Sequence, residues 1–288
     1  MADSVALRGS LHSAAALVDD AAWAAASCYG AAPHTAVEET VRRRWLITGA
    51  SYEGLNGVYW ARDGEAVDEA LAPFRQVEVP MLWHAGPTSP DTLPRELADA
   101  GLSHYGTEPG MVLDLDQPAN EGADSLDASR PGLGTFARWL PPEGLEIRRV
   151  GAEGQMRAWV RIWAAPPSRL LEDRLVALRA PMAYGVAART PHLLGVLDGE
   201  PVACAAVWVG RLPGQEGRPV AWLEHIATRI AVRRRGIGTA LTRACLDVAR
   251  RRAASHAALT ASPSAERLYR GLGFHDVCTV TRYLWSPR

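Results

Sequence analysis

A glycine-rich turn at residues 233–239 (Arg-Arg-Arg-Gly-Ile-Gly-Thr) constrains the fold more than any other feature of the chain. It follows an apolar, strand-like run at 221–228 and precedes an amphipathic segment at 241–250. Unpaired N–H groups and the positive end of the helix dipole meet at a helix N-terminus, and glycine lets a phosphate approach that backbone closely. The turn is predicted to cradle a phosphate or pyrophosphate, with a tight turn carrying solvated arginines as the alternative.

Two common nucleotide-binding motifs do not fit this turn. It lacks the Gly-Lys-Ser/Thr of a Walker A loop, and the Gly-x-Gly-x-x-Gly spacing of a dinucleotide fingerprint fails at Leu241. A second motif lies downstream, after another apolar run at 257–262. Its residues are Ala265-x-x-Leu268-Tyr269-x-x-x-Gly273-Phe274. The pair of motifs therefore carries more information than the glycine turn alone.

The two motifs together resemble the GCN5-related N-acetyltransferase (GNAT) superfamily. Arg233-x-x-Gly236-x-Gly238 is followed by a helix, a strand and the Ala265–Phe274 motif, in the family's order and at its separation. The resemblance is specific from about residue 145 to 288 and weaker before residue 117. It implies an α/β (α+β) fold in which a mixed, mostly antiparallel sheet is flanked by helices. It also implies acetyl-CoA, or another acyl-CoA, as co-substrate.

Periodicity in the second half predicts the element order that this family has. Strands are expected at 145–150, 192–197, 202–209, 221–228 and 257–262, with helices at 155–164, 168–179, 241–250 and after residue 264, and a final strand. A fainter copy of the order, with strands at 57–61, 80–85 and 111–115 and helices at 67–74 and 91–100, predicts an internal repeat.

Three segments are therefore predicted: a degenerate GNAT-like domain at 1–116, an acidic Pro/Gly linker at 117–144, and a catalytic GNAT domain at 145–288. The corner Ala100-Gly101-Leu102 would correspond to Leu272-Gly273-Phe274. In the first copy the turn is replaced by residues 62–66, with one glycine and two acidic residues. Because carboxylates repel a pyrophosphate, this copy is not expected to bind acyl-CoA.

The resemblance implies binding roles for residues of the second half. The pyrophosphate would lie on the turn, and the thioester along the strand at 221–228, where a backbone N–H would stabilise the oxyanion. Ser262 stands where many members have asparagine and could still hydrogen-bond cofactor or substrate. The expected binding residues are Ile226, Ala227, Thr228, Arg233, Arg234, Arg235, Gly236, Ile237, Gly238, Thr239 and Ser262.

Three residues are candidates for catalysis. Tyr269 matches a family position whose hydroxyl protonates the departing thiolate, although a packing aromatic has the same pattern. Glu224 and His225 are candidate bases, with Glu224 slightly favoured; an ion pair or a strand surface is the alternative for each. Neighbours on a strand face opposite sides, so we expect only one of the two to reach the cleft.

Trp159 and Trp163, four residues apart on a predicted helix, are expected to pack in the core rather than to line a pocket.

Charge is distributed unevenly along the chain. Residues 1–144 hold 9 Arg against 21 Asp and Glu, a net charge of −12, and residues 145–288 hold 22 Arg against 11, a net charge of +11. The basic half would attract an anionic cofactor or a nucleic acid, or pair with the acidic half.

No run of eighteen apolar residues and no signal-peptide pattern occurs, so a cytoplasmic protein without membrane contact is expected. The four cysteines and the histidines have no metal-ligand spacing, and no metal is expected.

The resemblance therefore implies an N-acyltransferase that moves an acyl group, above all acetyl, from acyl-CoA to a primary amine of a small molecule by direct attack. One alternative is an amide-forming transferase that uses aminoacyl-tRNA on the same fold, because a basic half suits a tRNA backbone. Another is a non-catalytic, ligand-binding GNAT pair. The acceptor's identity and the oligomeric state are not predicted.

Overall fold

The structure, a computed structural model, describes residues 2–61, 65–116, 141–164, 167–184, 188–212 and 217–287, and only the backbone of residues 2–13. The first half contains α1 (Ala2–Ser27), η1 (Cys28–Ala31), β1 (Ala36–Glu39), β2 (Arg43–Ile47), η2 (Glu53–Leu55), β3 (Gly57–Ala61), α2 (Val67–Val77), β4 (Met81–Ala85), α3 (Leu93–Asp99) and β5 (Ser103–Asp114). The second half contains β6 (Leu145–Arg149), α4 (Glu153–Trp163), α5 (Arg169–Ala183), β7 (His192–Leu197), β8 (Glu200–Gly210), β9 (Val220–Thr228), η3 (Ile230–Val232), α6 (Ile237–Arg251), β10 (His256–Thr260), α7 (Glu266–Gly271) and β11 (His275–Trp285).

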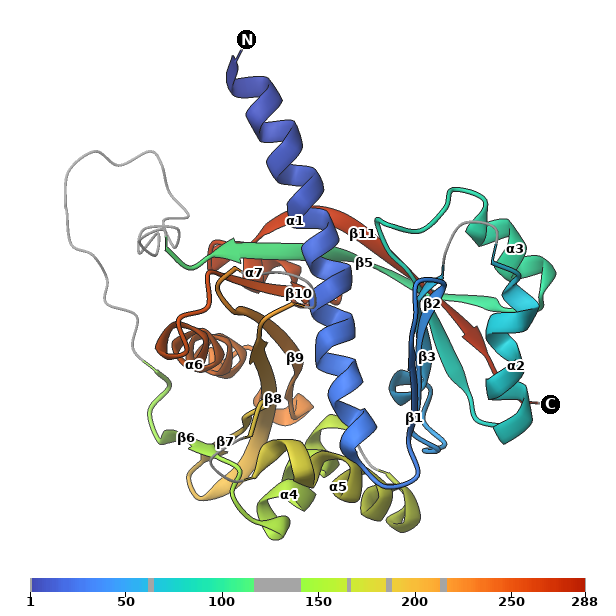
Figure 1. Cartoon of the computed structure of the whole chain (residues 1–288). Helices are drawn as coiled ribbons and strands as arrows, with labels where there is room; N and C mark the ends of the chain where they lie inside the picture. Colours follow the sequence, from blue (N-terminus) through green and yellow to red (C-terminus); the bar gives the residue numbers. More distant parts are fainter. Residues whose placement is uncertain are drawn as a thin grey trace.

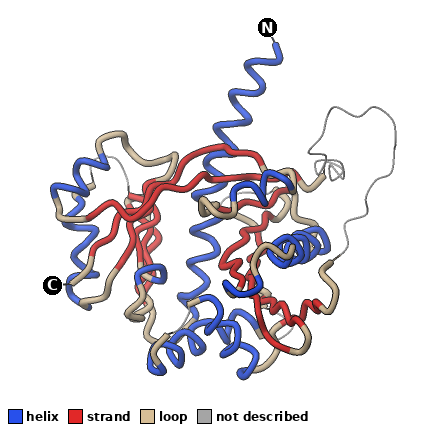
Figure 2. Tube along the Cα trace, turned by 180° about the vertical axis from the view of Figure 1, so that it is seen from behind, coloured by secondary structure: helices blue, strands red, loops and turns tan. Residues whose placement is uncertain are grey.

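All the strands of the described chain join one mixed sheet. Its order is β1-β2-β3-β4-β11-β5-β10-β9-β8-β7-β6, and the pairs β3–β4 and β9–β10 are parallel. Figure 2 shows the strands, in red, continuing from one half of the molecule to the other. The mixed α/β architecture that the sequence predicts is confirmed, and the two expected sheets prove to be continuous.

The sheet order is symmetric about its centre, because each half gives its last strand to the other. Strand β11 of the second half pairs with β4, and β5 of the first half pairs with β10. Between them β5 and β11 pair with each other along most of their length, from His275 opposite Val112 to Leu284 opposite Ser103. Figure 1 shows these two long strands crossing from one half to the other. The pattern of apolar residues did not predict this exchange.

The repeat also appears in the local geometry of two helix ends. Gly101 and Gly273 close α3 and α7 with φ angles of 88° and 94°, a left-handed conformation that glycine adopts without strain. After each glycine, the N–H of Leu102 or Phe274 donates to the carbonyl five residues earlier at 3.0 Å. Both helices therefore end in a Schellman motif, and β5 and β11 follow α3 and α7 through the same turn geometry.

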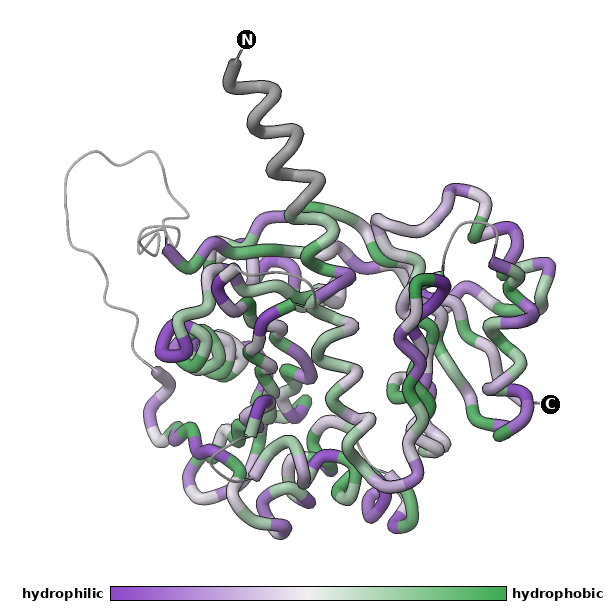
Figure 3. Tube along the Cα trace, viewed as in Figure 1, coloured by the Kyte–Doolittle hydropathy of each residue, from purple (hydrophilic) through white to green (hydrophobic). Residues whose placement is uncertain are grey.

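Helix α1 joins the cores of both halves. Val18 and Ala25 pack against Val112 of β5 and Trp222 of β9, and Trp23, together with Tyr29 of η1, shares a core with α4 and α5. Figure 1 shows α1 crossing the molecule between its two halves, and in Figure 3 its middle turns are mostly in the green of hydrophobic residues. Residues 18–29 therefore belong to the packing of the second half.

The structure contains every predicted strand and helix, most of them with small shifts of boundary, but β5 begins at Ser103, eight residues before the predicted strand at 111–115. It adds α1, β1 and β2, which the sequence pattern did not predict. Residues 62–64 of the degenerate turn and 117–140 of the predicted linker lie outside the described residues. The division at 117–144 stays a prediction.

The cysteine thiols are free, and two of them, Cys204 and Cys245, are buried. Within the described ranges, no helix is long and apolar enough to cross a membrane, and no three His, Cys, Asp or Glu side chains are grouped to hold a metal ion.

The exchange of β5 and β11 can be tested at Gly110, which lies opposite Cys278 in the register of the two strands. A methyl group there would overlap the Cys278 sulfur and meet Val18 of α1 at 3.0 Å. We expect Gly110→Ala to lower the free energy of unfolding by about 1–3 kcal/mol, the usual cost of overpacking, in urea denaturation. Gly106→Ala, on the same strand with no atom within 4 Å of the added carbon, is the control. Equal effects of the two substitutions would contradict tight packing at this crossing.

Candidate functional site

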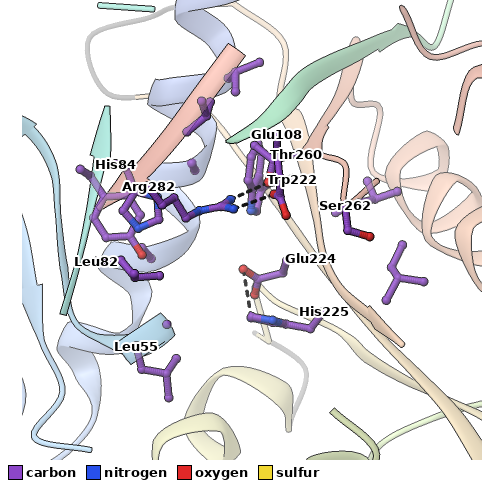
Figure 4. A pocket seen from close by; sticks show the side chains of 18 of the residues that line it. Leu55, Leu82, His84, Glu108, Trp222, Glu224, His225, Thr260, Ser262 and Arg282 are labelled. Atoms are coloured by element: carbon purple, nitrogen blue, oxygen red, sulfur yellow. Dashed lines mark hydrogen bonds and ion pairs between the residues drawn. The ribbon is translucent and has the colours of Figure 1, made fainter. Parts of the chain in front are cut away.

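A cavity of about 430 Å³ opens where β9 separates from β10. The two parallel strands pair only from Val220 to Trp222, opposite His256 to Ala258, and then diverge. Residues of both halves line the space: Tyr29, Leu55, Leu82, His84 and Tyr105 from the first, and Trp163, Glu224, His225, Ser262, Tyr269 and Arg282 from the second. Figure 4 shows Leu82 and His84 on one side, facing Glu224 and His225 on the other. The seam between the halves is therefore hollow.

A β-bulge at His225 aims two consecutive side chains at this cavity. Glu224 lies opposite Ala206 of β8, but the next regular pair is Ala227 with Cys204, so β9 has one extra residue between the two pairs. His225 lies in this bulge and has a left-handed φ of 56°. The bulge resets the alternation of side chains. The expectation that only one of Glu224 and His225 reaches the cleft is therefore wrong: both line the cavity.

The imidazole of His225 is neutral, and its protonated nitrogen can be assigned from its partner. Arg179 Nη2 lies 3.0 Å from His225 Nε2. Because arginine can only donate, Nε2 accepts and the ring proton lies on Nδ1. Burial, and then the charge of Arg179, hold the pKa of His225 well below its usual value. The 3.4 Å contact between Nε2 and Glu224 Oε2 is therefore not an ion pair.

Arg179 itself is buried at 0 % exposure. Its guanidinium carbon lies 4.3 Å from the ring centroid of Trp163, 4.6 Å from that of Trp159 and 5.4 Å from that of Tyr29. Cation–π contacts of this kind partly replace the water that a buried cation loses. On its other side Arg179 Nη1 lies 3.2 Å from His192 Nε2. The guanidinium thus joins α5, β7 and β9.

Among the described residues, two carboxylates line the cavity without a cation in direct contact, Asp19 of α1 and Glu224 of β9. Asp19 accepts from the Thr88 hydroxyl at 2.6 Å, and burial raises its pKa to about 6. Glu224 lies on the bulge, and its side chain is 15 % exposed. Burial raises its pKa, while the Arg179 charge and a hydrogen bond from Trp222 oppose that rise. A carboxylate with a raised pKa in a cavity is a suitable proton acceptor near neutral pH. Since His225 Nε2 already accepts from Arg179, Glu224 is the better base of the two.

The wall from the first half is aromatic and tightly packed. Tyr59 and His84 stack in parallel, with ring centroids 4.4 Å apart, where β3 and β4 end their short pairing. Burial, and then the charge of Arg282, keep the pKa of His84 well below its usual value. The Tyr29 hydroxyl is buried and has no hydrogen-bond partner among the described residues. This wall offers flat apolar surface and, at Tyr29, a buried hydroxyl that the described residues leave free to bond a ligand.

An ion pair spans the seam beside the cavity. Arg282 of β11 donates to Glu108 of β5 at 2.6 Å and to Thr260 of β10 at 2.8 Å. Figure 4 draws both contacts. The Glu108 charge is thereby compensated within the protein, which leaves Glu224 as the more available base.

Tyr269 of α7 lies at the cavity with 7 % of its surface exposed. Its ring meets the Phe274 ring edge-on, with centroids 5.8 Å apart. Burial raises the pKa of its hydroxyl, which therefore stays protonated and can donate. This position fits the prediction that Tyr269 reaches the cleft. Its ring also packs against Phe274, which fits the alternative of a packing aromatic.

The glycine-rich turn lies next to the cavity but does not line it. Arg233, Arg234 and Arg235 are exposed, and Arg233 Nε donates to the Thr228 carbonyl at 2.9 Å. Gly236 has a φ of 80° just before α6. A carbon added at Gly238 would lie 3.2 Å from Leu268 of α7. The turn therefore packs on the helix that carries Tyr269.

Six of the predicted site residues meet in one cavity, and the others do not line it. Those that line it are Glu224, His225, Ile226, Ala227, Ser262 and Tyr269; Thr228, Arg233, Arg234, Arg235, Gly236, Ile237, Gly238 and Thr239 lie beyond it. Trp159 is buried as predicted, with its Nε1 donating to the Ala205 carbonyl at 2.9 Å, but Trp163 lines the cavity.

Sequence reasoning missed Arg179, the most buried charge of the site. A signal was present, because Arg179 falls on the apolar side of a predicted helix, beside the buried positions Leu175, Val176 and Ala183. A charged residue at such a position needs a partner in the core. The partners, two histidines and three aromatic rings, come from segments far apart in sequence.

The counterpart of the turn in the first half is described only at its end. Arg62, Asp63 and Gly64 lie outside the described residues. Glu65 pairs with Arg43 at 2.8 Å and with Arg42 at 3.8 Å, and its side chain is 5 % exposed.

Known proteins share this fold. Residues 153–274 match the family model described as "Acetyltransferase (GNAT) family". A GCN5-related N-acetyltransferase from Kribbella flavida is 18 % identical, with a TM-score of 0.61, covering 95 % of this chain and 96 % of that one. A GCN5-related N-acetyltransferase from Sphaerobacter thermophilus is 18 % identical, with a TM-score of 0.52 and coverage of 81 % and 72 %.

A tandem GNAT protein from the clavulanic acid biosynthesis pathway is 16 % identical, with a TM-score of 0.55, covering 94 % of this chain and 88 % of that one. At these identities the three structures show a shared fold. No curated protein matches the chain at a significant level. The predicted resemblance is confirmed for part of the chain: residues 153–274 match the GNAT acetyltransferase family, and the solved structures share the fold over most of the chain.

Proposed function

We propose that the protein transfers an acetyl group from acetyl-CoA to a primary amine of a small molecule. The observation that carries this proposal is the Glu224 carboxylate, which the bulge of β9 aims into the cavity at the point where β9 and β10 diverge. A proton acceptor at a strand opening is what direct attack by an amine requires, because an ammonium group must lose its proton before it reacts.

The residues of the turn suit the pyrophosphate of acetyl-CoA. Gly236 adopts a left-handed φ of 80°, and the 15-residue helix α6 begins at the next residue. The N-terminal N–H groups of such a helix favour an anion. Arg233, Arg234 and Arg235 are exposed beside them and would add positive charge. When bound, acetyl-CoA supplies an acyl thioester whose carbonyl carbon the amine attacks.

The chain's own groups would then divide the proton transfers. Glu224 takes a proton from the acceptor ammonium. A backbone N–H among residues 226–228 donates to the developing oxyanion. As the C–N bond forms and the C–S bond breaks, Tyr269, whose hydroxyl stays protonated because burial raises its pKa, gives a proton to the departing thiolate and recovers one from the nitrogen of the tetrahedral intermediate. No covalent enzyme intermediate is needed for this sequence of events.

The acceptor would lie against the wall supplied by the first half. That wall carries Tyr52, Tyr59, His84 and Tyr105, together with Leu55 and Leu82. Flat aromatic surface with a nearby carboxylate suits an amine that has an apolar body, because the cation is attracted both by the rings and by Glu224. In this proposal the first half selects the acceptor, and the second half binds the donor.

The donor site can be tested by reversing one charge of the turn. Arg235→Glu is expected to raise the Kd for acetyl-CoA at least about tenfold, equal to 1.4 kcal/mol, because it places a carboxylate beside the pyrophosphate. Calorimetry with acetyl-CoA measures this. Arg95→Glu, an exposed arginine on α3, is the control and should bind as the wild type does. Unchanged binding by Arg235→Glu would contradict the site, and tRNA binding without acetyl-CoA binding would favour the alternative donor.

The base can be tested with Glu224→Gln, which keeps the shape of the side chain and removes its charge. We expect kcat to fall about a hundredfold or more, with the Kd for acetyl-CoA unchanged, in an assay of free thiol released with a panel of small primary amines. In the wild type, kcat/KM should fall as the pH drops through the raised pKa of Glu224, since protonation removes the base. That acidic limb should vanish in the variant. A variant that keeps both the rate and the limb would show that Glu224 is not the base.

A further inference from the structure

Behind the cavity lies a buried arginine that the proposed chemistry does not use directly. We propose that Arg179 is a positioning residue: it fixes His225 as a neutral imidazole with its proton on Nδ1, and it holds the neighbouring Glu224 carboxylate ionised. The effect on catalysis rests on the proposed role of Glu224. The effect on His225 belongs to the resting protein and can be tested separately.

The surroundings of Arg179 are unusual for a buried cation. Within the described part of the chain, no carboxylate oxygen lies within the 4.0 Å of an ion pair, and Nε has no hydrogen-bond partner. Instead, Trp159, Trp163 and Tyr29 surround the guanidinium. A buried charge without a counter-ion is costly. The polar groups that Arg179 contacts are two imidazoles, and Glu224 lies beyond one of them. These groups therefore experience the charge of Arg179 most strongly.

Both imidazoles are held in the same tautomer. His192 accepts from Arg179 Nη1 at Nε2, and its Nδ1 lies 2.7 Å from the Thr190 carbonyl, which can only accept. Its pKa is lowered to about 3 by burial and by the Arg179 charge. His225 accepts from Nη2 at its own Nε2. One guanidinium thus uses two of its N–H groups to orient two rings.

The consequence for Glu224 follows from the shared nitrogen. Arg179 and Glu224 Oε2 approach His225 Nε2 at 3.0 Å and 3.4 Å. If His225 were protonated, it would form an ion pair with Glu224 and compete with the substrate ammonium. Arg179 prevents this by occupying the lone pair and repelling a second positive charge. At the same time its own charge favours the ionised carboxylate across the ring.

Other titratable groups near Glu224 do not supply this effect. They come from η1, β3, β7 and β8, and each is held neutral by burial: Cys28, Tyr29, Tyr59, His192 and Cys204. Arg282 and Asp19 also line the cavity, but the charge of Arg282 is compensated by Glu108 and Asp19 brings no positive charge. Among the described side chains, Arg179 is therefore the positive charge without a carboxylate partner that acts on Glu224. Removing it should change the charge state of Glu224 more than removing any of these neutral groups.

The resting state can be examined in the wild-type protein by nitrogen NMR of labelled histidine. Between about pH 5 and 8, where a free histidine titrates, we expect His192 and His225 to stay neutral with protons on Nδ1. Assignment by His192→Gln and His225→Gln separates the two signals. Titration of His225 in this range, or a proton on its Nε2, would overturn the proposal whether or not the protein acetylates amines.

The effect on Glu224 can be measured with Arg179→Met, which keeps length and removes charge. We expect the acidic limb of kcat/KM to move to higher pH by about one unit, a tenfold change in the protonation equilibrium. Arg179→Lys, which keeps a positive charge, should shift it less.

Arg174→Met is the matched control on α5. Arg174 donates to the carbonyls of Pro33 and His34, so its loss should lower the melting temperature and leave the limb in place. A folded Arg179→Met protein whose limb does not move would show that Arg179 is structural only. If Arg179→Met does not fold, the Arg179→Lys profile and the wild-type NMR decide the matter.

Discussion

The pairing of β5 with β11 is the interaction on which the rest of the structure depends. Each half of the chain gives its last strand to the other half, so neither half-sheet is complete alone. The pairing fixes the two halves face to face and leaves the cavity at their seam. Because Arg282 of β11 pairs with Glu108 of β5 beside that cavity, the site and the strand exchange share residues. A change at the crossing should therefore affect both stability and the shape of the site.

The halves differ in what they bring to this seam. In the second half β9 and β10 diverge beside a glycine turn, and a bulge aims Glu224 and His225 into the opening. In the first half the equivalent opening between β3 and β4 is filled by the stacked rings of Tyr59 and His84. The second half thus keeps an opening between its strands that can admit a ligand, whereas in the first half aromatic side chains occupy the equivalent position and line the cavity.

The family fold and the position of the cleft could be predicted from sequence because they depend on local features. A glycine turn before a helix, a Gly-Phe corner after one and the alternation of strands all act within a few residues, and the chain shows them at 233–239 and 273–274. The direction of Glu224 and His225 could not be predicted in this way. It depends on a bulge, and a bulge is set by the register with β8, which lies elsewhere in the chain.

The sequence by itself determined the repeat of elements, the separation of an acidic from a basic half and the residues that can accept or donate protons. Only the tertiary structure decided that β5 joins the sheet of the second half and β11 that of the first, and that α1 packs into the core of the second half. It also decided that Arg179 lies among aromatic rings and two neutral imidazoles. The physical reason is range: propensities and turns act along the chain, whereas the charge state of a buried group depends on neighbours that only folding brings near.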